Sequence, residues 1–287
     1  MTFDSDNYSA EGNPSLQSQN ISQEQRFQNL RQVLNVFSRR HFSPYKVLVN
    51  RKARTVVILN PKVGTTSFRN LATRAYLEVL GAKDASEGRY KLFKKARYFP
   101  FASPHDYYHA FAHPHEYNFY CFVRNPYARL KSAWVDKFAN GHEYGYPHSI
   151  RGKLLRNIRR FASSHQLPGS VPKTLVPFST FVSYIDSQQD GKRNHHWDVQ
   201  HEVLMTDAIH YSHIYKMEGQ FIQGVTSIFD RLGIAESWTT QAMEKPSNES
   251  KKVNEAIFTP KLAEQAKRIY ARDFQIFGYD VDSWQGM

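Results

Sequence analysis

A run of apolar residues followed by an amphipathic stretch is the clearest pattern along the chain. Residues 55–59 (TVVIL) are typical of a buried strand. Farther on, apolar side chains recur every three or four residues, which is the spacing of one helix face. These positions are Phe68, Leu71, Ala72, Ala75, Tyr76, Val79 and Leu80. Because Gly81 suits a helix C-terminus, the pattern predicts a strand, a short turn and a helix.

The same order of strand and helix occurs a second time. Residues 117–123 (YNFYCFV) form a β-rich run, and an amphipathic stretch follows it. Pro126 falls in the first turn of that stretch, where the missing N–H of proline costs little, and Gly141 is placed to end the helix. Two strands that each feed a helix predict an α/β fold, in which helices cover the faces of a parallel sheet.

Weaker patterns predict the remaining elements. Strands are expected at 46–50 and 214–219, and helices at 22–39 and 151–165. Thr259 as N-cap and Pro260 at the first helical position predict the start of a C-terminal helix. Residues 1–24 are rich in Ser, Asn and Gln and are expected to form a disordered tail. No later segment has the composition of a linker, so residues 25–287 are expected to form a single domain.

The charge balance suits an anionic partner. Lys and Arg number 38 against 26 Asp and Glu, which gives a formal net charge of +12 and a pI near 9.6. A nucleotide, an acidic polymer, nucleic acid or a membrane surface would each satisfy this balance. No sequence motif typical of a nucleic-acid-binding protein is present, so nucleic acid is not an expected partner.

Cysteine content and hydropathy favour a cytoplasmic location. Cys121 is the only cysteine, so an intramolecular disulfide and a cysteine-based zinc site are excluded, and a reducing compartment is expected. No apolar run approaches the length of a transmembrane helix, and the first residues lack the basic and apolar regions of a secretory signal.

The turn after residues 55–59 has the composition of an anion site. The N-terminus of a helix directs unpaired N–H groups and a positive dipole at whatever lies before it. Lys62 adds a charge, and Gly64 allows the backbone to approach an anion closely. Hydroxyl donors follow at Thr65, Thr66 and Ser67. The alternative is a lysine beside an ordinary capped helix, because the pattern is not that of the nucleotide P-loop.

The second strand–helix junction strengthens the anion-site interpretation. Arg124 ends the strand, and Ser132 lies eight residues later. Ligands of open α/β sheets bind at the carboxyl ends of the strands, where both junctions would meet. A nucleotide with phosphates at both ends of its ribose would use two such sites. The alternative is that Arg124 and Arg129 form surface ion pairs.

These residues resemble the motifs of a known family. Residues 61–67 (PKVGTTS) resemble the 5′-phosphosulfate loop of sulfotransferases that use 3′-phosphoadenosine-5′-phosphosulfate (PAPS), and residues 122–138 resemble their 3′-phosphate motif. The carbohydrate sulfotransferases of the chondroitin and HNK-1 type, with their bacterial counterparts, are the most similar in style. Residues 195–219 and 258–280 resemble two further segments of that group. Together these matches cover most of residues 55–280, in the expected order.

The chain also departs from the animal enzymes. Those enzymes have an N-terminal membrane anchor, which this sequence lacks, and many have cysteines near the positions of Met205 and Ala208. Both departures favour a bacterial enzyme without a membrane anchor.

The resemblance implies a P-loop-like three-layer α/β/α sulfotransferase domain and a role for each motif residue. Lys62 would contact the sulfate and stabilise charge on the leaving phosphate. The 5′-phosphosulfate would be held by Pro61, Lys62, Gly64, Thr65, Thr66 and Ser67, and the 3′-phosphate by Arg124 and Ser132. Positioning and charge stabilisation would then carry most of the rate, with no metal required.

The acceptor hydroxyl needs a general base, and the chain has 13 histidines. In related enzymes a histidine between the two phosphate motifs often has this role, which makes His105 the first candidate. His109, one turn later on the same helix face, is the second, and His196 is the third. Each could equally be an ordinary surface or core histidine. A metal site at His105, His109 and His113, or at His195, His196 and His201, is the less favoured alternative.

The sequence as a whole predicts a PAPS-dependent sulfotransferase that acts on a hydroxyl of a carbohydrate or glycolipid. The basic residues at 151–160 favour an acidic acceptor, although a solvated helix face would have the same composition. An ATP-dependent kinase and a non-enzymatic polyanion-binding module are the alternatives. The kinase would need a P-loop and a metal-binding aspartate, and neither is evident in the sequence.

Overall fold

A computed structural model describes seven segments of the chain. They are residues 22–43, 46–69, 71–72, 102–139, 150–167, 176–234 and 257–286. Of the tail predicted at 1–24, residues 1–21 lie outside the described residues, as do the predicted helix beyond residue 72 and the predicted helix ends at Gly81 and Gly141. Residues 22–24 form the N-cap and first residues of a helix, Gln23–Phe37.

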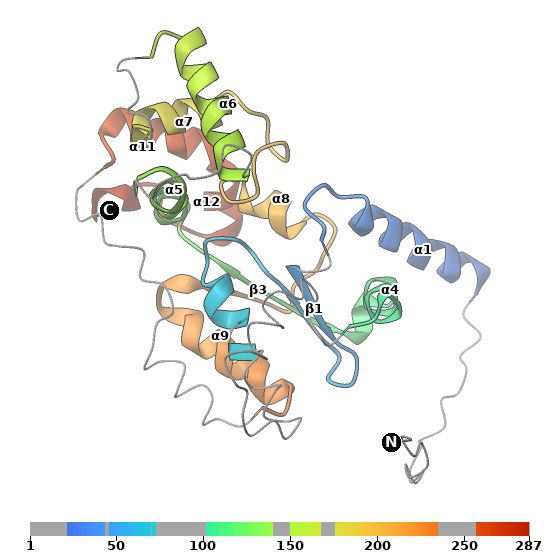
Figure 1. Cartoon of the computed structure of the whole chain (residues 1–287). Coiled ribbons are helices and arrows are strands. Elements are labelled where there is room, and N and C mark those ends of the chain that lie inside the picture. Colours follow the sequence, from blue (N-terminus) through green and yellow to red (C-terminus); the bar gives the residue numbers. More distant parts are fainter. Residues whose placement is uncertain are drawn as a thin grey trace, which may run out of the picture.

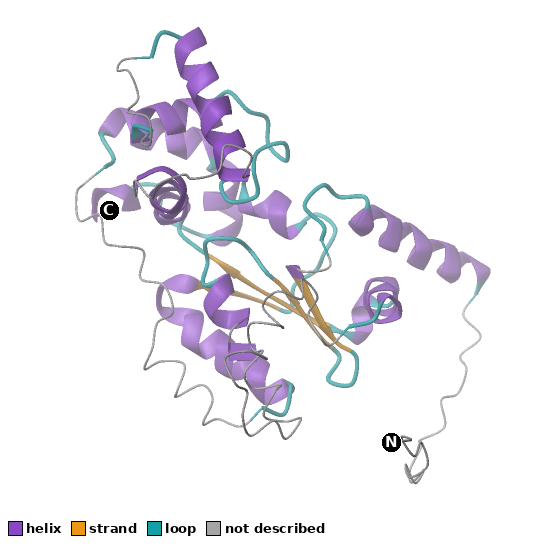
Figure 2. Ribbon diagram, viewed as in Figure 1, coloured by secondary structure: helices purple, strands orange, loops and turns teal. Residues whose placement is uncertain are grey.

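A four-stranded sheet forms the centre of the fold (Figure 1; Figure 2). Its strands are β1 (Val47–Asn50), β2 (Thr55–Ile58), β3 (Asn118–Val123) and β4 (His213–Lys216), which lie in that order across the sheet. The predicted parallel arrangement is confirmed for β2, β3 and β4. β1 is antiparallel to β2 because only the four residues 51–54 connect them, which is too short for a parallel crossover.

Side chains of β2 alternate between two separate cores. Val56 and Ile58 pack into one cluster with residues of α1 (Gln23–Phe37) and α4 (Pro104–Ala112). Val57 packs into the other with residues of the 65–72 region and of α9 (Met217–Arg231). Figure 1 accordingly shows α1 and α4 beside one face of the sheet and α9 beside the other. The three-layer α/β/α arrangement predicted from the sequence is confirmed.

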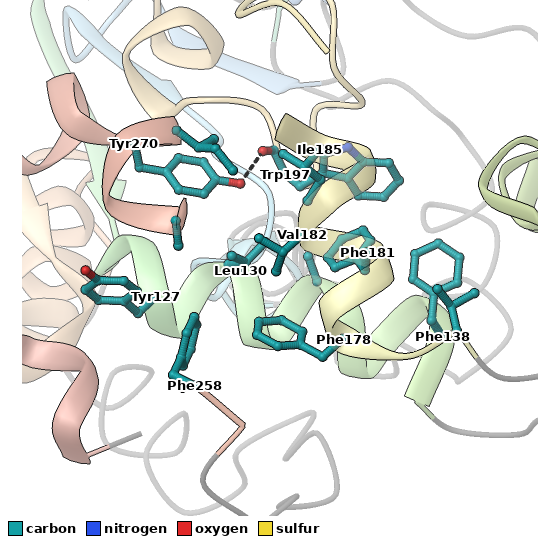
Figure 3. Packing of buried hydrophobic residues seen from close by; sticks show 14 of the residues in the cluster. Tyr127, Leu130, Phe138, Phe178, Phe181, Val182, Ile185, Trp197, Phe258 and Tyr270 are labelled. Atoms are coloured by element: carbon teal, nitrogen blue, oxygen red, sulfur yellow. Dashed lines mark hydrogen bonds between the residues drawn. The ribbon is translucent and has the colours of Figure 1, made fainter. Parts of the chain in front are cut away.

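A third core lies among the remaining helices (Figure 3). These helices are α5 (Pro126–Trp134), α6 (Ile150–Ser164), α7 (Phe178–Asp186), α11 (Pro260–Ile269) and α12 (Ala271–Phe277), whereas α8 (Gln200–Leu204) places Leu204 in the core beside α1 and α4. A π-helical segment, Val135–Ala139, continues α5, and short 3₁₀ helices occupy Pro114–Glu116 and Ser283–Gly286. In this core the Tyr270 hydroxyl donates to the Trp197 carbonyl at 2.7 Å. That contact fixes the loop before α8, which belongs to the candidate site.

The predicted helix starts are confirmed in detail. Thr259 caps α11 by accepting a hydrogen bond from the Leu262 N–H, and Pro260 occupies the first helical position. Asn125 caps α5 through the N–H groups of Tyr127 and Ala128. Within the part of the chain that the structure describes, no helix has both the length and the apolar character needed to cross a membrane.

Candidate functional site

A buried hydrogen bond between the side-chain amides of Asn60 and Gln200 fixes the turn after β2. Asn60 is fully buried, and its Nδ2 donates to Gln200 Oε1 at 2.9 Å and to the Phe122 carbonyl at 3.3 Å. The Thr65 hydroxyl donates to the Asn60 carbonyl, which ties the end of the turn to its beginning. Gln200 belongs to α8, so the position of the turn depends on a residue 140 positions away in the sequence.

The backbone of this turn has two left-handed residues. Lys62 has φ 70° and Gly64 has φ 76°. Left-handed geometry is uncommon for lysine, and such conformations concentrate at ligand sites. At Gly64 a Cβ atom would lie 2.7 Å from the Phe221 ring, so only glycine fits there without displacing α9. A helix begins at Thr65, with the Phe68 N–H bonded to the Gly64 carbonyl at 2.9 Å. The turn therefore leads directly into a helix N-terminus, as predicted.

The Lys62 ammonium is paired with an acid in this state. Lys62 Nζ lies 3.2 Å from Asp136 Oδ2, and Lys137 Nζ lies 2.9 Å from the same oxygen. Burial lowers the pKa of Lys62, and the charge of Asp136 opposes that shift. Burial alone would raise the pKa of Asp136, but the two ammonium groups outweigh it and lower the pKa to about 2. Asp136 thus holds Lys62 in place and is a weak base.

Arg124 joins the same turn from the end of β3. Its Nη1 donates to the Lys62 carbonyl at 3.2 Å, which brings the two predicted phosphate motifs into contact. The Arg124 backbone is fixed by Gln200, whose side chain bonds both its N–H, at 3.0 Å, and its carbonyl, at 2.8 Å. Ser132 lies half-buried on the second turn of α5, the helix that Asn125 caps immediately after Arg124.

Arg129 is a buried residue that links two loops through hydrogen bonds. Its side chain is 2% exposed, so the alternative of a surface ion pair does not apply to it. Nε donates to the Pro61 carbonyl at 3.1 Å, Nη2 to the His195 carbonyl at 3.0 Å and Nη1 to the Asp198 carbonyl at 2.7 Å. One guanidinium therefore connects the Lys62 turn to residues 195–198.

His196 lies beside the Lys62 turn and has an unused ring nitrogen. Its Nδ1 is 2.7 Å from Asn194 Oδ1, so Nδ1 carries the proton and Nε2 has a lone pair. Among the described residues Nε2 has no hydrogen-bond partner. Burial lowers the pKa of His196 to about 2, with further lowering by Lys137, His195 and Lys62. The imidazole is neutral and surrounded by positive charge.

His105 and His109, the first two candidates for the base, lie at the other end of the sheet. His105 Nδ1 is 3.3 Å from Arg51 in the β1–β2 hairpin, and His109 Nδ1 is 3.0 Å from the Tyr117 hydroxyl, just before β3. Both contacts are at the amino ends of β2 and β3, whereas Lys62 follows the carboxyl end of β2. The physical reason is topological: α4 leads into the start of β3, so its side chains cannot reach the end of that strand. The structure therefore does not bring them to Lys62.

Comparison with known proteins identifies the family of this chain. The sequence profile described as "Sulfotransferase family" matches residues 45–280. The chain belongs to the sulfotransferase family. No solved structure matches this chain closely enough to be counted as similar.

Individual relatives are distant members of this family. Carbohydrate sulfotransferase 14 of Danio rerio is 25% identical over 243 residues, which are 82% of this chain and 62% of that protein. Carbohydrate sulfotransferase 11 of Mus musculus is 24% identical over 171 residues, or 58% of this chain and 47% of that protein. Carbohydrate sulfotransferase 12 of Xenopus laevis is 30% identical over 111 residues, or 36% and 26%. The chain thus spans less than two thirds of the length of these curated relatives.

The two weaker sulfotransferase segments meet at Glu218. Its Oε1 accepts from the Asn125 N–H at 3.0 Å and lies 4.0 Å from Arg124 Nε, and its Oε2 accepts from the Tyr279 hydroxyl at 2.9 Å. Neither Glu218 nor Gln200 was predicted to contribute to the site, and Arg129 was considered only as a member of a surface ion pair. Only their location within the segments that resemble the sulfotransferases could have indicated them. Each acts through contacts with residues distant in the sequence, which no local pattern reveals.

We expect Arg129→Lys to destabilise the protein by about 2–4 kcal/mol, because lysine cannot reach three carbonyls and would leave buried acceptors unsatisfied. Urea unfolding followed by circular dichroism measures the change. Arg272→Lys, at an exposed position on α12, is the matched control and should stay within about 0.5 kcal/mol of the parent. Equal stability of the two variants would contradict the structural role of Arg129.

Proposed function

We propose that this chain transfers the sulfuryl group of PAPS to a hydroxyl of a carbohydrate or glycolipid acceptor. In this reaction the S–O bond to the 5′-phosphate breaks and a bond from sulfur to the acceptor oxygen forms. The products are a sulfate ester, adenosine 3′,5′-bisphosphate and a proton. The names of the relatives, which are carbohydrate sulfotransferases, support a carbohydrate acceptor.

The contact between Lys62 and Arg124 is the observation that carries the proposal. Each residue follows one of two adjacent parallel strands, and the Arg124 guanidinium lies on the Lys62 carbonyl at 3.2 Å. Two cations at a helix N-terminus suit a ligand with separate anionic groups. In the proposal the turn Pro61–Ser67 holds the phosphosulfate, and Arg124 with Ser132 holds the 3′-phosphate.

Lys62 is proposed to exchange partners when the donor binds. Its ammonium now faces Asp136, which Lys137 can retain at 2.9 Å. Lys62 would then stabilise the negative charge that develops on the leaving phosphate. The site consists of side chains and backbone N–H groups. Among the described residues no group of three or more His, Cys, Asp or Glu side chains is placed to hold a metal ion.

His196 is the base that the geometry supports best. Among the described residues its Nε2 has no hydrogen-bond partner, and the ring lies within electrostatic reach of Lys62, whereas Asp136 Oδ2 is already in contact with two ammonium groups. The low pKa of His196 arises from burial and from the positive charges of Lys137, His195 and Lys62. An anionic donor beside these charges would raise that pKa, so the base would be strengthened when the donor is bound.

Lys62→Ala should lower the turnover number by roughly 10²–10³-fold, the usual effect of removing one group that stabilises transition-state charge. Transfer of radiolabelled sulfate from PAPS across a panel of glycans and glycolipids measures it. Lys261→Ala, at an exposed position on α11, is the control and should retain activity. Turnover by Lys62→Ala close to that of the control, in a folded protein, would refute the assigned role.

His196→Gln should lower turnover by roughly 10²–10⁴-fold, the range expected for loss of a general base. His105→Gln and His109→Gln are matched controls at the other end of the sheet and should stay near the parent value. In the parent, nuclear magnetic resonance should show the pKa of His196 rising when adenosine 3′,5′-bisphosphate is added. Loss of activity in His105→Gln with retention in His196→Gln would reverse the assignment.

A further inference from the structure

Lys46 lies beside the proposed donor turn without belonging to either phosphate motif. It immediately precedes β1, which runs antiparallel to β2. The Leu59 N–H donates to the Lys46 carbonyl at 2.7 Å, so Lys46 is level with the carboxyl end of β2. Because the strand order is β1-β2-β3, Lys46 and Arg124 flank that end from opposite sides.

The Lys46 ammonium is half-buried and has no counterion among the residues that the structure describes. Within the described segments it makes no hydrogen bond or ion pair. Buried lysines are almost always paired, because an unpaired charge loses solvation without compensation. Burial, and then the positive charge of Arg129, lower the pKa of Lys46 to about 8. A half-buried ammonium without a counterion among the described residues is suited to bind an anionic group of a ligand.

Neighbouring cations differ from Lys46 because their polar groups are already used. Arg129 donates to three carbonyls, and Lys137 and Lys62 share Asp136. His41 Nε2 is 2.8 Å from Asp198 Oδ2. Within the described part of the chain, Lys46 is therefore the cation of this group that can bind an anion without giving up a partner.

His195 connects Lys46 to the proposed base. Burial lowers the pKa of His195 to about 4, and Lys46 contributes the largest share among the charged neighbours, ahead of His41, Arg129 and Lys137. The rings of His195 and His196 lie 4.2 Å apart between centroids. The Lys46 ammonium is therefore within electrostatic reach of the imidazole pair.

We propose that Lys46 binds a carboxylate group of the acceptor and thereby orients the reacting hydroxyl toward His196. Lys46 is thus a positioning residue that selects acidic acceptors. The inference rests on the proposed function, because that function assigns Lys62 and Arg124 to the donor and leaves the side of Lys46 to the acceptor. If Lys46 instead held a donor phosphate, its removal would weaken the nucleotide and not the acceptor.

Binding of two polymers to the complex with adenosine 3′,5′-bisphosphate tests this assignment. Chondroitin carries one carboxylate per disaccharide, and carboxyl-reduced chondroitin has the same backbone without it. The parent should prefer chondroitin, and Lys46→Met should lower its affinity for chondroitin about tenfold while leaving the reduced polymer unaffected. Lys52→Met, at an exposed position of the β1–β2 hairpin, is the matched control, and Lys46→Arg should keep the preference.

The dependence on pH adds a readout that loss of packing would not change. The parent's preference should be lost at alkaline pH, above the pKa of about 8 that Lys46 has without the bisphosphate, because Lys46 loses its charge, whereas Lys46→Arg should keep its preference. The charged and titratable neighbours on this side are Arg129, His195, His41 and Lys137. His195, with a pKa of about 4, is neutral in this pH range, and His41 is hydrogen-bonded to Asp198.

The outcomes separate the inference from the proposed function. No preference for chondroitin in the parent, equal losses for both polymers in Lys46→Met, or weaker bisphosphate binding in that variant would each overturn the role of Lys46. Failure of the parent to bind bisphosphate at all would instead overturn the proposed function.

Discussion

The buried Arg129 guanidinium is the interaction on which the arrangement of the site depends. It crosses from α5 to the Pro61 carbonyl in the donor turn and to the His195 and Asp198 carbonyls in the loop before α8. Burying this charge is costly unless it is hydrogen-bonded, and three carbonyl acceptors supply that compensation. Asp198 is itself fixed by His41 and by two backbone N–H groups. The turn and the histidine pair therefore hold their relative positions as one unit.

This packing concentrates positive charge at the carboxyl end of the sheet. Lys46, Lys62, Arg124, Arg129 and Lys137 lie around the turn, and Asp136 offsets only part of their charge. The low pKa of His196 and the lowered pKa of Lys46 are two consequences of the same field and burial. An anionic donor would relieve both effects. In the proposal, electrostatics couples donor binding to activation of the base, and the exchange of partners by Lys62 is the structural change that accompanies it.

Local patterns in the sequence predicted the elements well, because the strands are apolar runs and the helices carry clear caps. The meeting of Lys62 and Arg124 was also predictable, since adjacent parallel strands end at one edge of a sheet. The burial of Arg129 was not, because an arginine that satisfies backbone carbonyls has the same sequence signature as one in solvent. His105 was chosen by its order in the chain, but α4 leads to the amino end of β3. His196, ranked third, lies beside Lys62 because Arg129 holds its loop there.

Calorimetric binding of adenosine 3′,5′-bisphosphate and 5′-AMP to the parent and to Arg124→Ala tests the central claim most directly. We expect the parent to bind the bisphosphate far more tightly than AMP, and Arg124→Ala to lose most of this difference while its affinity for AMP changes little. Absence of bisphosphate binding in the parent, or equal weakening of both nucleotides in Arg124→Ala, would contradict the assignment of this edge of the sheet to the sulfate donor.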